Sequence, residues 1–243
     1  MREIYQKSWF EIEFDSLNIS TSNKEIANVK FYKEFYKEFY KKYHCYDDLP
    51  KRWIALKMEI ANHILELVNN NSNFLLLSIG CGNGFIENKI IESGAVSNII
   101  AIEPGGYTDK WINKDKIKFY NGLFPEAIKN DYNANELGFV YASGIDYVFD
   151  DKEYLNFLKS VKNYGIKNFL LTEIFIPNKN ILSIIKHNIQ SVLSRFGYDR
   201  GQFWGYLRTI DEHIYFLREA GFKNKLDYGK YAHGGYWILV SDD

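Results

Sequence analysis

Three glycines stand at alternate positions in the stretch LLLSIGCGNGFIENKI, residues 75–90. Apolar residues precede Gly80, Gly82 and Gly84, and a helix-like pattern follows them. A strand, a tight turn and a helix in this order form a common nucleotide-binding unit, because backbone N–H groups at the turn remain free for a ligand. The spacing of the glycines then indicates which nucleotide the turn holds.

The glycine spacing argues against the phosphate-rich nucleotides. A dinucleotide-binding turn reads G-x-G-x-x-G, and its third glycine lets the helix pack closely on the strand. Phe85 occupies the position of that third glycine here, and its ring would crowd a pyrophosphate. A P-loop needs a Gly-Lys-Ser/Thr sequence, which does not follow. We therefore expect a ligand without phosphates against the glycine backbone.

A carboxylate ends the next apolar segment, NIIAIEP (residues 98–104). This residue is Glu103, nineteen residues beyond Gly84. A carboxylate at this place can accept hydrogen bonds from both hydroxyls of a ribose. NAD enzymes also have such an acid, so its meaning here comes from its combination with the glycine spacing.

The elements that must position these residues alternate along the chain from about residue 74. Apolar runs and helix-like segments follow one another, which predicts an α/β fold with a doubly wound, seven-stranded, mostly parallel sheet. We expect strands at 74–79, 98–103, 116–120, 138–142, 168–174, 224–229 and 236–241, and helices at 85–93, 108–113, 152–163, 180–195 and 210–220. About six residues join the last two strands, which therefore form an antiparallel hairpin.

The N-terminal residues 1–59 are predicted to form a helical cap, and residues 60–243 the nucleotide-binding domain. The segment FYKEFYKEFYKKY (31–43) places Phe31, Phe35, Phe39 and Tyr43 on one helical stripe. An aromatic cage for a methylated cation is the alternative interpretation of this repeat. A second helix is expected at 50–68, and a short strand near 9–14. The cap would offer Tyr32, Tyr36 or Trp53 as a pocket wall.

Composition limits the classes of partner. The net charge of −1 provides no general attraction for a polyanion, so we expect no nucleic-acid partner. Cys45 and Cys81 are far apart and form no CxxC pair. The N-terminus lacks the apolar core of a signal peptide, and no apolar run is long enough to span a membrane. These features predict a cytoplasmic protein without a membrane partner; the oligomeric state stays open.

The order of these motifs resembles the class I S-adenosylmethionine-dependent methyltransferases, which have a Rossmann-like fold. LLLSIGCGNG looks like their first motif, Glu103 their second acid, and GFVYASGIDYVFDD (138–151) their fourth-strand segment. The resemblance implies S-adenosyl-L-methionine (SAM) as cofactor and S-adenosyl-L-homocysteine (SAH) as product. It departs from the family at Ser78, where an acid is usual, and at Asn121, where Asp is frequent. The implied cofactor residues are Ser78, Gly80, Cys81, Gly82, Gly84, Glu103, Asn121, Gly122, Leu123 and Ser143.

Methyl transfer from a sulfonium mostly requires alignment in a dry pocket, and a hydroxyl acceptor also needs its proton removed. The candidates for this base are His233 and Asp146, with Tyr147 as an orienting donor. His213 is interpreted as structural. Asp146 and Glu173 provide only two carboxylates for a cation, so no metal is expected.

Arginines alternate with aromatic residues after the fifth strand, which suits an acidic or sugar-like acceptor. The candidate substrate residues are Arg200, Trp204, Tyr206 and Arg208. We therefore expect methyl transfer to a small polar metabolite, most simply to an oxygen of a sugar, a sugar phosphate or a surface-polysaccharide precursor. Two alternatives remain: a catalytically silent SAM- or SAH-binding regulator, and an NAD-dependent Rossmann enzyme.

Overall fold

The main sheet of the protein has seven strands in the order β10-β11-β8-β7-β4-β5-β6. The computed structural model describes residues 2–22, 24–68, 75–105, 111–177, 189, 192, 198–223 and 225–241. The strands are β4 (Leu76–Ile79), β5 (Ile99–Ile102), β6 (Ile117–Tyr120), β7 (Phe139–Ser143), β8 (Asn168–Ile174), β10 (Lys225–Lys230) and β11 (Tyr236–Ser241). Only β11 runs antiparallel to its neighbours, β8 and β10. The predicted mostly parallel sheet with a terminal hairpin is confirmed.

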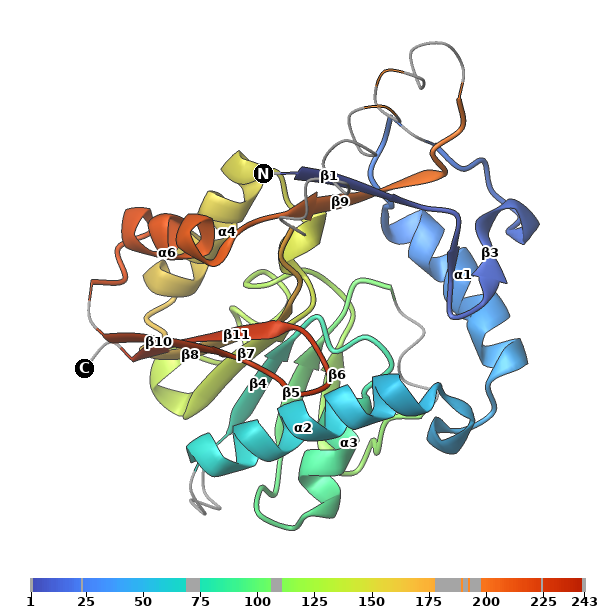
Figure 1. The fold of residues 1–243 in the computed structure, drawn as a ribbon. Helices are drawn as coiled ribbons and strands as arrows, with labels where there is room; N and C mark the ends of the chain where they lie inside the picture. Colours follow the sequence, from blue (N-terminus) through green and yellow to red (C-terminus); the bar gives the residue numbers. More distant parts are fainter. Residues whose placement is uncertain are drawn as a thin grey trace.

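Helices cover both faces of this sheet, because the strand residues alternate between two apolar clusters (Figure 1). Leu76 packs in the cluster that contains α2 (Lys51–Val68) and α3 (Phe85–Glu92). Leu77 packs in the cluster that contains α4 (Asp151–Asn163) and α6 (Ile210–Glu219). Burial on both faces explains why these strands read as continuous apolar runs.

The strand order reverses at β4, the first strand of the sheet along the chain. From β4 the sheet grows through β5 and β6 on one side and through β7 and β8 on the other. The loops that leave the carboxyl ends of β4 and β7 therefore diverge and leave a crevice between them, where ligands of open parallel sheets bind.

The N-terminal segment contains strand β1 in addition to the short strand that was predicted near residues 9–14. Helix α1 (Val29–Lys42) begins with an Asn28 cap, whose side chain accepts a hydrogen bond from the Phe31 N–H. Strand β1 (Arg2–Gln6) pairs antiparallel with β9 (Gln202–Leu207) in a separate sheet (Figure 1). Strands β2 (Ser8–Trp9) and β3 (Ile12–Glu13) form a short hairpin where a single strand was expected near residues 9–14. The predicted boundary between residues 59 and 60 falls inside α2 and stays a prediction.

Aromatic residues hold the N-terminal segment together in one buried group, here called the N-terminal aromatic cluster. Its buried members are Ile12, Phe14, Leu17, Ala27, Phe31, Phe35, Tyr36, Phe39, Tyr40, Tyr43, Leu49, Phe85 and Trp204. The predicted stripe of α1 therefore packs as a hydrophobic face. Trp204 enters the cluster from β9 and Phe85 enters it from the start of α3, directly after the glycine turn.

One predicted helix is not observed, and another lies mostly outside the described residues. Residues 111–113, the described end of the expected helix 108–113, are not helical. Nearly all of the expected helix 180–195 lies outside the described residues. No helix in the described part of the chain combines the length and apolar character needed to cross a membrane.

Candidate active site

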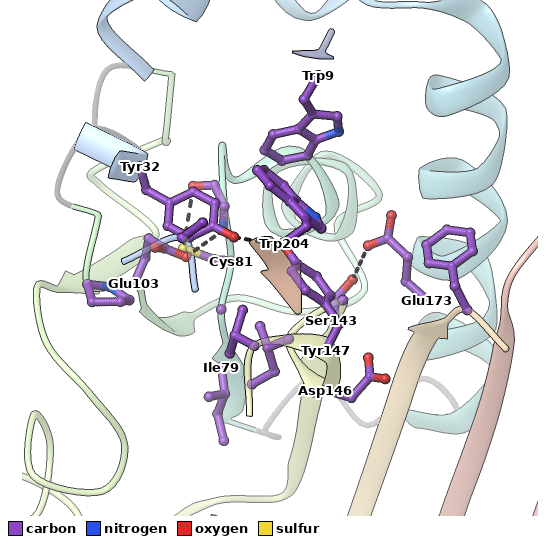
Figure 2. Close-up of a pocket in the computed structure, with 18 of the residues that line it drawn as sticks. Trp9, Tyr32, Ile79, Cys81, Glu103, Ser143, Asp146, Tyr147, Glu173 and Trp204 are labelled. Atoms are coloured by element: carbon purple, nitrogen blue, oxygen red, sulfur yellow. Dashed lines mark hydrogen bonds between the residues drawn. The ribbon is translucent and has the colours of Figure 1, made fainter. Parts of the chain in front are cut away.

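A cavity of about 1200 Å³ opens at the carboxyl ends of β4, β5, β7 and β8. Seven predicted cofactor residues line it: Gly80, Cys81, Gly82, Glu103, Gly122, Leu123 and Ser143. All three predicted catalytic residues, Asp146, Tyr147 and His233, line it as well. Figure 2 shows Glu103 and Cys81 at one end of this cavity and Glu173 at the other. Ser78, Gly84 and Asn121 are not among the lining residues.

The three glycines of the turn serve different purposes. All three have positive φ, between 56° and 76°, a region that L side chains rarely adopt. A Cβ at Gly80 would lie 2.1 Å from Ile145 Cγ2, and one at Gly84 would lie 2.4 Å from Ile112 Cγ1. A Cβ at Gly82 would meet only Tyr36 Oη, at 3.4 Å. Gly80 and Gly84 thus allow close packing, whereas Gly82 leaves open space in the cavity wall.

Glu103 lies beside this open glycine. Its Oε2 accepts the Gly82 N–H at 3.2 Å, and its Oε1 accepts the Gly105 N–H at 3.0 Å. Desolvation raises the pKa of Glu103, although both backbone hydrogen bonds favour the ionised carboxylate. Each oxygen keeps a further lone pair for a donor from a ligand. Glu103 thus lies at the strand end where an acid was expected, and its binding to a ribose stays a prediction.

Ser78 lies inside β4, beneath the turn rather than in the cavity wall. Its hydroxyl donates to Glu87 Oε1 at 2.5 Å, and the Tyr141 hydroxyl donates to the same oxygen at 2.8 Å. Glu87 is buried and burial raises its pKa, while its Oε2 has no hydrogen-bond partner among the described residues. The Glu87 carboxylate of α3 therefore lies beside Ser78, the position at which β4 itself has no acid. The sequence pattern gave no signal for it, because Glu87 occupies an ordinary helix position.

Asp146 begins the short 3₁₀ helix η5 (Asp146–Val148) and is buried. Its Oδ2 lies 3.6 Å from Nε2 of His213, and both atoms lack a hydrogen-bond partner among the described residues. Burial raises the pKa of Asp146 to about 7, against the opposite effect of the Arg208 guanidinium. Burial lowers the pKa of His213 to about 3. Asp146 thus faces His213, whose other ring nitrogen contacts the Tyr154 hydroxyl at 2.7 Å.

The other two catalytic candidates differ in their surroundings. His233 is half exposed at the cavity edge, and its Nδ1 lies 3.1 Å from Glu59 Oε2. The Tyr147 hydroxyl lies 3.2 Å from the Tyr32 hydroxyl, and the Tyr147 ring stacks on Trp204. These contacts connect the cavity wall to α1 of the N-terminal segment.

Of the four predicted substrate residues, only Trp204 lines the cavity. Arg200 lies over the ring of Tyr5, at 3.5 Å from its centroid. Arg208 is fully buried, pairs with Asp151 and donates to the Asp146 carbonyl oxygen. Arg200, Tyr206 and Arg208 are therefore not placed where they would contact a ligand in this cavity. The alternation of arginines and aromatics instead belongs largely to strand β9 and its flanks.

The cavity also contains lining residues that were not predicted as site residues. Lys57 of α2 and Glu173 at the end of β8 form an ion pair. The Ser143 hydroxyl donates to the same carboxylate (Figure 2). In the sequence, the position of Glu173 at the end of a strand was the only sign that this ion pair would lie in the cavity wall. The aromatic wall that was expected from the N-terminal segment includes Trp9, Tyr32, Tyr36 and Trp53. No group of three or more potential metal ligands occurs among the described residues.

No protein-family model and no curated protein sequence matches the chain. Solved structures do match it at the level of the fold. Human N-acetylserotonin methyltransferase in complex with SAM has a TM-score of 0.58 and 13% identity, with 88% of this chain and 56% of that chain covered. Magnesium protoporphyrin IX methyltransferase from Synechocystis PCC 6803, with bound SAH, has a TM-score of 0.51 and 11% identity, with coverages of 79% and 84%.

The similar structures differ in size and in the acceptors that they name. The small RNA methyltransferase HEN1 has a TM-score of 0.54 and 12% identity, with 77% of this chain but only 25% of that chain covered. The chain thus spans little more than half of the human enzyme and a quarter of HEN1. What these proteins share with it is the fold. The chain has the fold of the class I S-adenosylmethionine-dependent methyltransferases.

Proposed function

We propose that the protein is a SAM-dependent methyltransferase that acts on a small molecule. The observation that carries this proposal is the pairing of Gly82 and Glu103 in the cavity wall. Gly82 leaves space that a single Cβ would begin to fill, and Glu103 presents a carboxylate beside it. A ligand with a ribose but without phosphates fits this pairing.

The described residues fit SAM as the ligand. Backbone groups of Gly80–Asn83 would lie along it, and Glu103 would accept its ribose hydroxyls. Leu123 lines the cavity yet is 63% exposed, so its apolar surface is available to an adenine ring. When bound, SAM would supply an electrophilic methyl group. The chain's own contribution would be to align the acceptor and to exclude water.

The acceptor is the finer part of the proposal. An oxygen of a sugar, a sugar phosphate or a polysaccharide precursor was expected from Arg200 and Arg208, but both lie outside the cavity wall. Aromatic rings contribute much of that wall, which suits a ring with an apolar face. We therefore propose that the acceptor is an oxygen on a small ring compound. Arg200 and Arg208 give no support for a phosphate group on that compound.

Calorimetry with SAM, SAH and NAD tests the proposal. We expect SAM and SAH to bind and NAD to fail, because Phe85 replaces the third glycine of a dinucleotide-binding turn. Transfer of a tritiated methyl group from SAM to a panel of hydroxyl compounds then tests turnover. Tight NAD binding without SAH binding would refute the proposal. Binding of SAH without any turnover would favour the silent regulatory protein.

A further inference from the structure

Lys57 and Glu173 form a largely buried ion pair at the end of the cavity away from Glu103. Each side chain is only 12% exposed, and both residues line the cavity. The Lys57 ammonium also lies 5.3 Å from the centre of the Trp53 ring. Removal of two charges from water is costly, so a pair at this depth needs good geometry or a function that retains it.

The contacts of Glu173 fall on one of its two oxygens. Oε2 receives the Lys57 ammonium and also the Ser143 hydroxyl, the latter at 3.0 Å. Neither Lys57 nor Ser143 bonds to Oε1, and no hydrogen bond to Oε1 occurs among the described residues. A carboxylate oxygen accepts more than one hydrogen bond, so Oε1 is the acceptor that remains for a ligand.

The backbone is arranged to place this carboxylate. Glu173 has φ of 59°, a left-handed conformation that is costly for a residue with a side chain. Gly144 lies opposite it, and a Cβ at Gly144 would come within 2.7 Å of Glu173 Oε2. A strained residue and a side-chain-free neighbour thus make room for one carboxylate in the cavity wall. Such strain persists where the surrounding structure over-determines it, and it gathers at functional sites.

The two residues that the sequence offered as the base, Asp146 and His233, are less suitable for this role than Glu173. Asp146 directs Oδ2 toward His213, and this oxygen is buried from the cavity. His233 is held by Glu59 at the exposed edge. Glu173 combines a position in the cavity wall with an oxygen that its neighbours leave unused.

We propose that Glu173 binds the hydroxyl group of the methyl acceptor and receives its proton. Lys57 and Ser143 act as positioning residues that fix the other carboxylate oxygen. This inference rests on the proposed methyltransferase function and names the acceptor class for the same site: an uncharged ring compound that carries a hydroxyl group.

The step balances without a further reactant. The hydroxyl oxygen forms a bond to the methyl carbon, and the carbon–sulfur bond breaks with its electron pair going to sulfur. The hydroxyl proton passes to Glu173 and leaves to solvent after the products depart. An anionic acceptor is disfavoured because its charge would approach Glu173, whereas Tyr147, Trp53 and Trp204 line the cavity with aromatic carbon against which an uncharged acceptor can pack.

The test compares three ring probes on the full-length protein saturated with SAH: phenol, anisole and benzoate. Phenol has the hydroxyl, anisole carries a methyl in place of its proton, and benzoate is an anion. We expect phenol to bind about tenfold more tightly than anisole, the scale of one charge-assisted hydrogen bond. Glu173→Gln should remove most of this difference and admit benzoate. Glu219→Gln, on the exposed end of α6, is the matched control. It should change neither the difference in affinity between phenol and anisole nor the binding of benzoate.

A kinetic measurement separates a catalytic from a structural role. With phenol as acceptor and tritiated SAM, Glu173→Gln should lower kcat by about 100-fold, within the range of general-base effects, while SAH affinity is unchanged. Glu173→Asp should restore part of kcat, because it restores a carboxylate. Equal binding of phenol and anisole, or full turnover in Glu173→Gln, would overturn this inference. Failure of the wild-type protein to bind SAH would instead overturn the proposed function.

Discussion

Replacement of Glu103 by alanine should weaken SAM binding by about 1.5–3 kcal/mol, the range of hydrogen bonds to charged groups. At about 1.4 kcal/mol per factor of ten, the dissociation constant should rise roughly 10- to 150-fold. The structure supports this range because both oxygens of Glu103 are already held by backbone N–H groups, at 3.2 and 3.0 Å. The carboxylate is thus oriented before the ligand arrives, and little side-chain entropy is lost on binding.

Isothermal calorimetry with SAM and SAH measures the effect, and a thermal melt of each variant shows that the turn remains folded. Glu103→Gln is the matched control, because it keeps the size of the side chain and one acceptor oxygen, for either Gly82 or Gly105, but removes the charge. Its loss of affinity should be smaller than that of Glu103→Ala. A dissociation constant that is unchanged in Glu103→Ala would refute the assignment of this carboxylate to the ribose.

Three further predictions concern the glycine turn, the buried pair of Asp146 and His213, and the N-terminal cap. Gly82→Val should abolish SAH binding in calorimetry and leave the circular-dichroism spectrum native-like, whereas Gly80→Val should unfold the protein because its Cβ would meet Ile145. In Asp146→Asn, the free energy of unfolding in urea should rise as the pH rises from about 3 to 6.5. Burial lowers the pKa of His213 from 6.5 to about 3. Over this pH range His213 is therefore protonated in the unfolded state but not in the native state, so the native state gains stability as the pH rises. The free energy of unfolding of the wild-type protein should depend less on pH, because the raised pKa of Asp146 lowers stability as the pH rises from 3.8 to about 7. An equally weak pH dependence in Asp146→Asn would contradict this explanation. Proteolysis between residues 10 and 50 should slow when SAH is added, and equal cleavage with and without SAH would show that this segment does not close over the cofactor.

The sequence was sufficient to predict the sheet because its signals are local. Strands β4, β5, β7 and β8 are buried apolar runs bounded by a turn or a helix, and the short connection of about six residues before the last strand allows only a hairpin. Glu103 was predicted for the same reason, since the carboxyl end of a strand can be read from the end of its apolar run. Strand β1 escaped prediction because its partner, β9, lies at the other end of the chain and forms its own sheet. Pairing at such a distance leaves no local pattern.

The acceptor end of the cavity was harder to predict, because its residues depend on packing between elements. Lys57 reads as an ordinary polar position of an amphipathic helix, and it reaches the cavity only because α2 packs beside the ends of β7 and β8. Arg208 reads as a solvent-exposed or ligand-binding residue, yet it is fully buried against Asp151. Burial of an arginine is not visible in a sequence when its partner belongs to another element.

Phe85 connects the choice of ligand to the N-terminal segment. In the sequence it argues against a dinucleotide, because it replaces the third glycine, which lets the helix pack closely on the strand in a dinucleotide-binding turn. In the structure its ring is buried between Tyr46 and Trp53, with centroid distances of 5.1 and 5.3 Å. A glycine at this position would remove the contact by which the N-terminal aromatic cluster reaches the turn. The same side chain thus disfavours one class of cofactor and fixes the segment that supplies the aromatic wall for the acceptor.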